Sequence, residues 1–84
     1  MHRVNVSIQP MMCSFTCIFY DPATSCGIGR TRKFHELDRV MEVLIRAGVP
    51  AEAREQVRAA MKENRPTTVR LNLTPGQLAK LQHG

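Results

Sequence analysis

Residues 34–65, FHELDRVMEVLIRAGVPAEAREQVRAAMKENR, contain the two clearest helical patterns of the chain. In the first half, apolar residues recur every three or four positions, which is the spacing of one face of an α-helix. These residues are Phe34, Leu37, Val40, Met41, Leu44 and Ile45. The second half repeats the pattern with smaller residues, namely Ala53, Val57, Ala60 and Met61. We therefore predict two amphipathic helices in this stretch.

The link between the two helices is very short. Gly48 is suited to the left-handed conformation that ends many helices, and Val49 can then fold back onto the last turn. Pro50 suits the first position of the second helix, where its missing N–H costs nothing. Because so few residues separate them, the helices must be neighbours, and we predict a helical hairpin or corner.

Strand patterns flank this helical pair. In residues 2–9, Val4, Val6 and Ile8 alternate with polar residues, which predicts a strand with one face exposed to solvent. A second strand is predicted over residues 12–20, and its core face carries Cys13, Phe15, Cys17 and Phe19. Residues 67–73 alternate in the same way as the first strand. A short final helix should follow, because Thr74 and Gln77 have the spacing of a capping box.

These elements predict one α+β domain over residues 1–84. Its order is β-β-α-α-β-α, with a small antiparallel or mixed sheet and the helical pair packed on one face. The opposite sheet face is then exposed or meets a partner. Its expected residues are Arg3, Asn5, Ser7, Arg70 and Asn72.

Charge and cysteine content limit the class of protein. The formal net charge is +5, which favours anionic partners. Three cysteines, an odd number, do not suggest a secreted disulfide framework. The first residues alternate instead of forming the apolar run of a signal peptide, and the apolar patch around residues 11–20 is too short to span a bilayer. We expect a cytoplasmic protein without membrane partners.

The main candidate site is the basic loop before the first predicted helix. Gly27 and Gly29 allow close approach of a ligand to the backbone, and Arg30, Arg32 and Lys33 supply positive charge. Together with a helix N-terminus they predict a site for an anion or an acidic partner. Two other interpretations remain open at this stage: a solvated loop, and a short strand within residues 28–33.

A secondary basic face lies on the second predicted helix. Arg54, Arg58 and Lys62 are four positions apart and share one side of it. Glutamates are interleaved with them, which is also typical of a solvated helix face. The helical pair is not a standard helix-turn-helix DNA reader, because a strand follows it where a supporting third helix is required.

The three cysteines do not form a clear metal-binding, disulfide or catalytic motif. On one strand, Cys13 and Cys17 would be about 13 Å apart, too far to share a metal ion or a disulfide bond, so both are expected to be buried. Cys26 lies beside glycines and cations, and His35 follows in the sequence. A thiol nucleophile paired with a histidine is therefore one hypothesis, but no third, orienting residue is identifiable. We predict no catalytic residue, no metal and no cofactor.

These observations favour a small non-enzymatic binding, regulatory or accessory protein of bacterial or phage type. It would act through contact with a protein partner or as a homodimer, using the basic loop. One alternative is nucleic-acid binding through the basic loop and the helix face. A second alternative is a thiol enzyme using Cys26.

Overall fold

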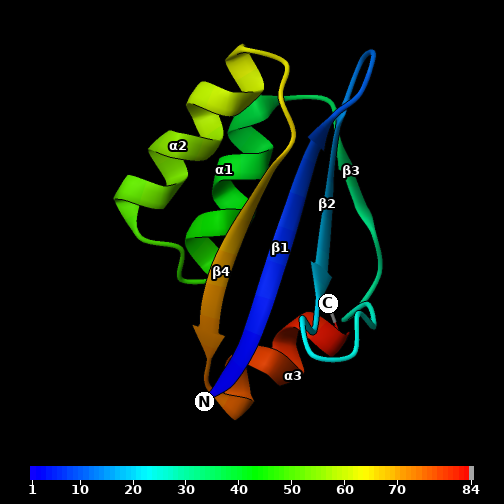
Figure 1. Cartoon of the computed structure of the whole chain (residues 1–84), viewed down its shortest axis with the longest axis vertical. Helices are drawn as coiled ribbons and strands as arrows, with labels where there is room; N and C mark the ends of the chain where they lie inside the picture. Colours follow the sequence, from blue (N-terminus) through cyan, green and yellow to red (C-terminus); the bar gives the residue numbers. More distant parts are fainter. Residues whose placement is uncertain (84) are drawn as a thin grey trace.

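The structure is a computed structural model that describes residues 1–83. A four-stranded antiparallel sheet forms its centre. The strands are β1 (His2–Pro10), β2 (Phe15–Tyr20), β3 (Arg32–Phe34) and β4 (Thr67–Leu73), in the spatial order β3-β2-β1-β4. The helices are α1 (Leu37–Arg46), α2 (Ala51–Lys62) and α3 (Pro75–His83). The predicted α+β class, with a helical pair on one face of the sheet, is confirmed (Figure 1). The short strand β3 was not part of the predicted order, but it overlaps the alternative interpretation of a short strand within residues 28–33.

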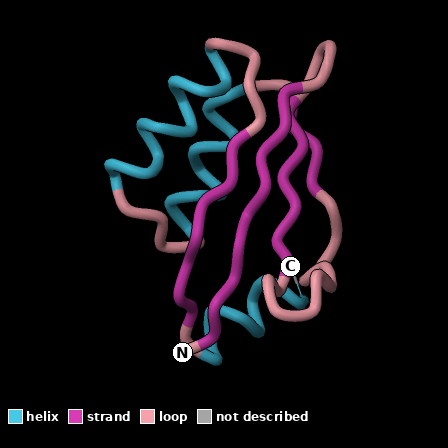
Figure 2. Tube along the Cα trace, viewed as in Figure 1, coloured by secondary structure: helices cyan, strands magenta, loops and turns pink. Residues whose placement is uncertain are grey.

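β1 lies inside the sheet because it pairs along most of its length with β2 on one side and β4 on the other. The chain runs β1, β2, β3 as successive neighbours, then passes through α1 and α2 before β4 returns to the far side of β1 (Figures 1 and 2). Alternation along β1 is as predicted, since Val4, Val6 and Ile8 are buried. Strands distant in sequence are thereby held side by side.

The β1–β2 connection corrects two predictions. β2 begins at Phe15, opposite Pro10, and not near residue 12. Residues 11–14 form the turn, which the Met11 N–H closes by donating to the Ser14 carbonyl at 2.7 Å. Cys13 therefore lies in an exposed turn, where we had expected a buried strand residue.

Two residues of the predicted first helical face are also placed differently. Phe34 belongs to β3, where it pairs with Phe15, so α1 begins only at Leu37. Ile45 is 54% exposed, because it is about 100° around the helix axis from its buried neighbour Leu44. The buried face of α1 is narrower than the sequence pattern and consists of Val40, Met41 and Leu44.

The turn between α1 and α2 has the predicted geometry at Gly48 and Val49, but Pro50 is the N-cap residue with an extended backbone, so α2 begins at Ala51 and not at Pro50. Gly48 has φ +86°, and its N–H donates to the Ile45 carbonyl at 3.0 Å. The Val49 N–H donates to the Leu44 carbonyl at 3.0 Å, and Val49 is buried. This pattern ends α1 with a left-handed cap and turns the chain directly into α2.

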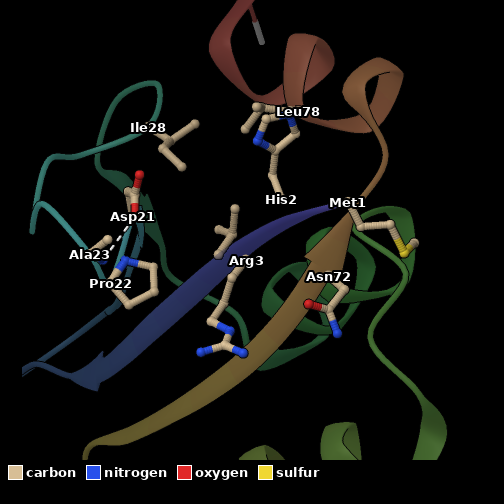
Figure 3. Close-up of a pocket in the computed structure, with 10 residues that line it drawn as sticks. Met1, His2, Arg3, Asp21, Pro22, Ala23, Ile28, Asn72 and Leu78 are labelled. Atoms are coloured by element: carbon tan, nitrogen blue, oxygen red, sulfur yellow. Dashed lines mark hydrogen bonds between the residues drawn. The ribbon is translucent and has the colours of Figure 1, made fainter.

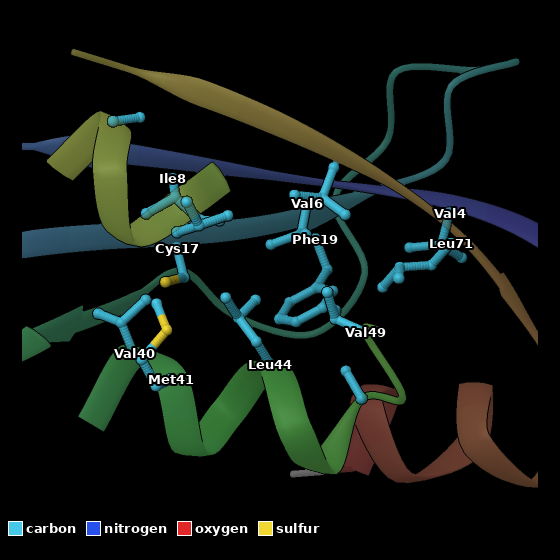
Figure 4. Close-up of a cluster of buried hydrophobic side chains, with 14 of the residues drawn as sticks. Val4, Val6, Ile8, Cys17, Phe19, Val40, Met41, Leu44, Val49 and Leu71 are labelled. Atoms are coloured by element: carbon cyan, nitrogen blue, oxygen red, sulfur yellow. The ribbon is translucent and has the colours of Figure 1, made fainter. Parts of the chain in front are cut away.

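The core lies between the sheet and the two helices. Phe19 and Cys17 of β2 face Leu44 and Val40 of α1, with valines and leucines of β1 and β4 beside them (Figure 4). Such a core is almost wholly aliphatic. Its burial supplies most of the favourable free energy of folding.

α3 crosses the end of the sheet where β1 begins (Figure 1). Its predicted capping box is present: the Thr74 N–H donates to Gln77 Oε1 at 2.9 Å, and the Gln77 N–H donates to Thr74 Oγ1 at 3.2 Å. Leu78 and Leu81 pack partly buried against the core. α3 therefore closes one end of the core without covering the opposite face of the sheet.

Candidate functional site

One side of the sheet packs against α1 and α2. We call the opposite side the open face. Strand alternation and the pairing register define it. Its residues are Arg3, Asn5, Ser7, Gln9, Thr16, Ile18, Tyr20, Lys33, Thr68, Arg70 and Asn72. Only Ile18 and Tyr20 among them carry large apolar groups, so this face is polar.

One row across the open face brings three different chemical groups together. Asn5 of β1 is directly opposite Tyr20 of β2 on one side and Arg70 of β4 on the other. Directly opposed side chains of adjacent strands have Cβ atoms about 5 Å apart. An aromatic ring, an amide and a guanidinium group are therefore neighbours on three consecutive strands.

Asn5 is the centre of this row. Its Nδ2 donates a hydrogen bond to the Tyr20 hydroxyl oxygen at 3.3 Å. Its Oδ1 is buried and has no hydrogen-bond partner within residues 1–83. A buried amide oxygen without a partner carries a desolvation cost in the folded chain.

The charges of the open face are of one sign. Arg3, Lys33 and Arg70 are its cations, and none of its residues is acidic. In the part of the chain that the structure describes, none of these three side chains has an ion-pair partner. Asp21, immediately after β2, is the acid nearest to this face along the strands.

The helical side has the opposite character, because its acids and bases are interleaved. Six of the seven acidic residues lie between Glu36 and Glu63, in α1, α2 and their flanks. Arg58 Nη1 lies 4.0 Å from Asp38 Oδ1, and Arg58 Nε lies 3.8 Å from Glu55 Oε1. Residues 36–63 thus carry five cations against six acids, whereas the open face carries three cations and no acid.

The structure separates the three cations of the predicted basic loop. Lys33 lies opposite Thr16 and belongs to the open face. Arg32 lies opposite the buried Cys17 and thus faces the helical side. Arg30 is exposed in the connection before β3. These cations do not precede a helix directly, since β3 intervenes before α1.

Both predicted loop glycines have roles in the backbone. Gly27 forms a bridge with Tyr20, and the next N–H, that of Ile28, donates to the Phe19 carbonyl at 2.8 Å. Gly29 has φ +70°, and a Cβ atom there would collide with the carbonyl group of Leu81. Gly29 thus lets the loop pack closely against the last turn of α3.

The predicted secondary basic face lies on α2. Arg58 is paired with acids, as described above, whereas Lys62 is exposed. Arg54 is half-buried, and its Nε has no hydrogen-bond partner within residues 1–83. Arg58 is therefore already partly neutralised, unlike the three cations of the open face.

The three cysteines differ in their exposure to solvent. Cys13 and Cys26 are exposed, whereas Cys17 is fully buried. Burial raises the pKa of the Cys17 thiol to about 11, although the nearby positive charge of Arg32 lowers it in part. The Cys17 thiol is consequently protonated at neutral pH.

Cys26 and His35, the pair considered in the thiol-enzyme hypothesis, are not brought together. Cys26 precedes the residue that bridges to Tyr20, and His35 follows the residue that pairs with Phe15. Tyr20 and Phe15 are five residues apart on β2, so their Cα atoms are separated by about 16 Å. Cys26 and His35 therefore lie near opposite ends of this strand. His35 Nδ1 instead lies 3.2 Å from the Cys13 carbonyl oxygen. Within residues 1–83, no three histidine, cysteine or acidic side chains are grouped as metal ligands.

A cavity of about 620 Å³ adjoins the open face where β1 begins. Arg3 and Asn72 extend into this region from adjacent strands, and the His2 ring lies beside Leu78 (Figure 3). Asp21 borders the cavity, but its Oδ1 accepts a hydrogen bond from the Ala23 N–H at 2.8 Å. Sequence reasoning predicted a polar sheet face but not this cavity, which depends on how the loop after β2 folds toward α3.

No protein-family model matches the chain, and no similar protein was found among curated proteins or among solved structures. No helix within residues 1–83 combines the length and apolar character needed to cross a lipid bilayer.

Proposed function

We propose that this chain is a small non-enzymatic binding protein whose open face binds single-stranded nucleic acid. The proposal depends on three cations, Arg3, Lys33 and Arg70, which share a sheet face without a carboxylate and have no ion-pair partner among residues 1–83. The phosphate backbone is the ligand that such a surface attracts, because each neutralised phosphate releases counterions.

The positions of the cations suit an extended strand of nucleic acid. Arg3 and Arg70 are diagonal neighbours on β1 and β4. Lys33 lies on β3, at the opposite corner of the face. A chain running from one corner to the other would cross all four strands.

Tyr20 and the amides supply contacts to bases. Tyr20 lies in the same row as Arg70, two strands away, and an aromatic ring on a sheet is a platform for stacking an unpaired base. The exposed amides of Gln9 and Asn72 on the same face can form hydrogen bonds with bases. With one aromatic residue, we expect weak binding, with Kd on the order of 10⁻⁵ M at low salt.

The composition of the open face favours nucleic acid over an acidic protein. Protein interfaces have a central cluster of aromatic or aliphatic anchors. The open face offers only Ile18 and a hydrogen-bonded Tyr20. This preference differs from our expectation from sequence, in which a protein partner came first, because the register groups cations that are distant in sequence.

Fluorescence anisotropy with labelled single-stranded RNA and DNA, and with the matching duplex, tests the proposal. The test variant combines Arg3→Gln, Lys33→Gln and Arg70→Gln. The control combines Arg39→Gln, Arg58→Gln and Lys62→Gln, which removes the same charge from the helical side. We expect at least a tenfold loss of single-strand affinity in the test variant and less than threefold in the control.

Two outcomes would contradict the proposal: equal losses in the two variants, or no binding of the unaltered chain at low salt. Polyglutamate, as a mimic of an acidic protein, should compete weakly. Stronger binding to polyglutamate than to RNA would favour an acidic protein partner. Circular dichroism of each variant establishes that its fold is retained.

A second candidate function is protein contact through β4, either with another protein or in a homodimer. β4 is an edge strand of seven residues, and no strand within residues 1–83 pairs with its outer side. Such an edge can add a strand from another chain. Its only charged residue is Arg70, so it has little of the protection that edge strands usually carry.

Sedimentation velocity and hydrogen exchange test this second candidate. A homodimer through β4 would give a concentration-dependent sedimentation coefficient, with slower amide exchange in β4 at high concentration. A monomer at every concentration, with β4 exchange unchanged, would exclude the homodimer. In either case we propose a cytoplasmic protein, as expected from the sequence.

A further inference from the structure

A second cavity, of about 320 Å³, lies on the helical side of the molecule. Its walls come from three elements: Val43 and Ala47 of α1, Leu73 at the end of β4, and Leu81 of α3. These side chains form an apolar lining between α1 and α3. Binding sites for small molecules usually combine an apolar lining with a few convergent polar groups.

The polar groups around this cavity are all hydrogen-bond donors. Arg46 of α1, Lys80 of α3 and Arg32 of β3 border it from three elements. Gln77 also lines it, and its Oε1 already accepts the Thr74 N–H, so its Nε2 is the group left to bind a ligand. Among residues 1–83, no acidic side chain lines the cavity.

Two of the cations are available for a ligand. Within residues 1–83, neither Arg46 nor Lys80 has an acidic partner. Both stand at the rim of an apolar cavity, where a charge pair is less screened than in open water. A ligand that filled the cavity with its apolar body could place an anionic group between them.

The C-terminus of α1 would oppose an anion if its carbonyl groups were free, because a helix C-terminus carries partial negative charge. They are not free. The carbonyls of Val43, Leu44 and Ile45 accept hydrogen bonds from the N–H groups of residues 47, 49 and 48 respectively. These hydrogen bonds therefore weaken the partial negative charge at the C-terminus of α1, which would otherwise repel an anion in the cavity.

We propose that this cavity binds a small monocarboxylate with a compact apolar body, of the size of a medium-chain fatty acid. The cavity volume lies at the lower end of the range for small-molecule sites, which limits the ligand to a short chain or a single ring. The apolar body contacts Val43, Leu73 and Leu81, and the carboxylate lies between Arg46 and Lys80. This site is on the opposite side of the sheet from the open face and does not depend on nucleic-acid binding.

The test is an NMR titration of the ¹⁵N-labelled chain with octanoate, with octanamide as the uncharged match and with acetate as the anion alone. We expect the amides of Val43, Ala47 and Leu81 to shift. Octanoate should bind at least tenfold more tightly than octanamide, and acetate more weakly than either. Amides of β1 that face away from the cavity should not respond.

Paired charge variants complete the test. Arg46→Gln with Lys80→Gln should weaken octanoate binding at least tenfold and leave octanamide binding unchanged. Arg39→Gln with Lys62→Gln removes the same net charge elsewhere on the helical side and should change neither affinity. Equal affinities for octanoate and octanamide, an equal loss in both variants, or no shifts up to the solubility limit would each overturn the proposal.

Discussion

Cys17 is the residue at which burial has the clearest chemical consequence. Its side chain is fully buried opposite α1, and its thiol has a pKa raised to about 11 because burial disfavours the thiolate. In the unfolded chain the thiol has its ordinary pKa of 9.0. Because the folded state holds the proton more tightly, this contribution to stability is complete below pH 9 and is lost as the pH rises to 11.

We therefore predict a specific alkaline instability that depends on Cys17. Between pH 9 and pH 11, the unfolding free energy of the unaltered chain should fall by on the order of 2 kcal/mol more than that of Cys17→Ala. Urea unfolding at several pH values measures this difference. Cys26→Ala should follow the unaltered chain, because Cys26 is exposed. Parallel pH curves for all three proteins would contradict the prediction.

The two loop glycines form a matched pair for testing backbone strain. At Gly29, alanine must adopt φ +70° and its Cβ collides with the Leu81 carbonyl, whereas at Gly27 a Cβ meets no atom within 4 Å. The left-handed backbone alone costs a non-glycine residue about 1–2 kcal/mol. We predict that Gly29→Ala lowers the melting temperature by roughly 10 °C. Gly27→Ala should shift it by only a few degrees, and equal effects would argue against the close contact with α3.

At the scale of single elements, turn and capping motifs predicted the ends of helices more accurately than hydrophobic periodicity predicted their buried faces. The Gly48 turn and the Thr74 capping box were correctly identified because each depends on residues within a few positions of one another. Ile45 was wrongly assigned to the buried face, since a helical pattern does not define how wide a face the sheet will cover. β3 has three residues and depends on pairing with β2, so the sequence indicated a short strand within residues 28–33 only as one of several interpretations of this segment.

The capping box makes a prediction about α3 as an element. Thr74→Ala removes the acceptor for the Gln77 N–H, and we expect a loss of about 1 kcal/mol of stability. Gln77→Ala should cost less, because the Thr74 N–H it frees can bind water. A double-mutant cycle from thermal unfolding measures the coupling of the two side chains. Additive losses would mean that they do not act as one cap.

At the scale of the whole molecule, the candidate site depends on register, which the sequence does not specify. Alternation along each strand predicted that Arg3, Asn5 and Arg70 share a face. It did not predict that Arg70, Asn5 and Tyr20 form one row, because that requires the pairing of strands far apart in sequence. The same pairing sends Lys33 to the open face and Arg32 to the helical side. The basic loop of the sequence is thus divided between two surfaces.

This division of charge leads to a quantitative prediction for the salt dependence of binding. Single-stranded nucleic acid loses affinity with a slope of about −0.7 per neutralised phosphate on a logarithmic plot against salt concentration. If Arg3, Lys33 and Arg70 each contact one phosphate, the slope is about −2. Each single Gln substitution should make it shallower by about 0.7, whereas Arg58→Gln should leave it unchanged, because Arg58 is already paired with Asp38 and Glu55. A slope that depends only on net charge, and not on which face loses the cation, would show that the open face is not the binding surface.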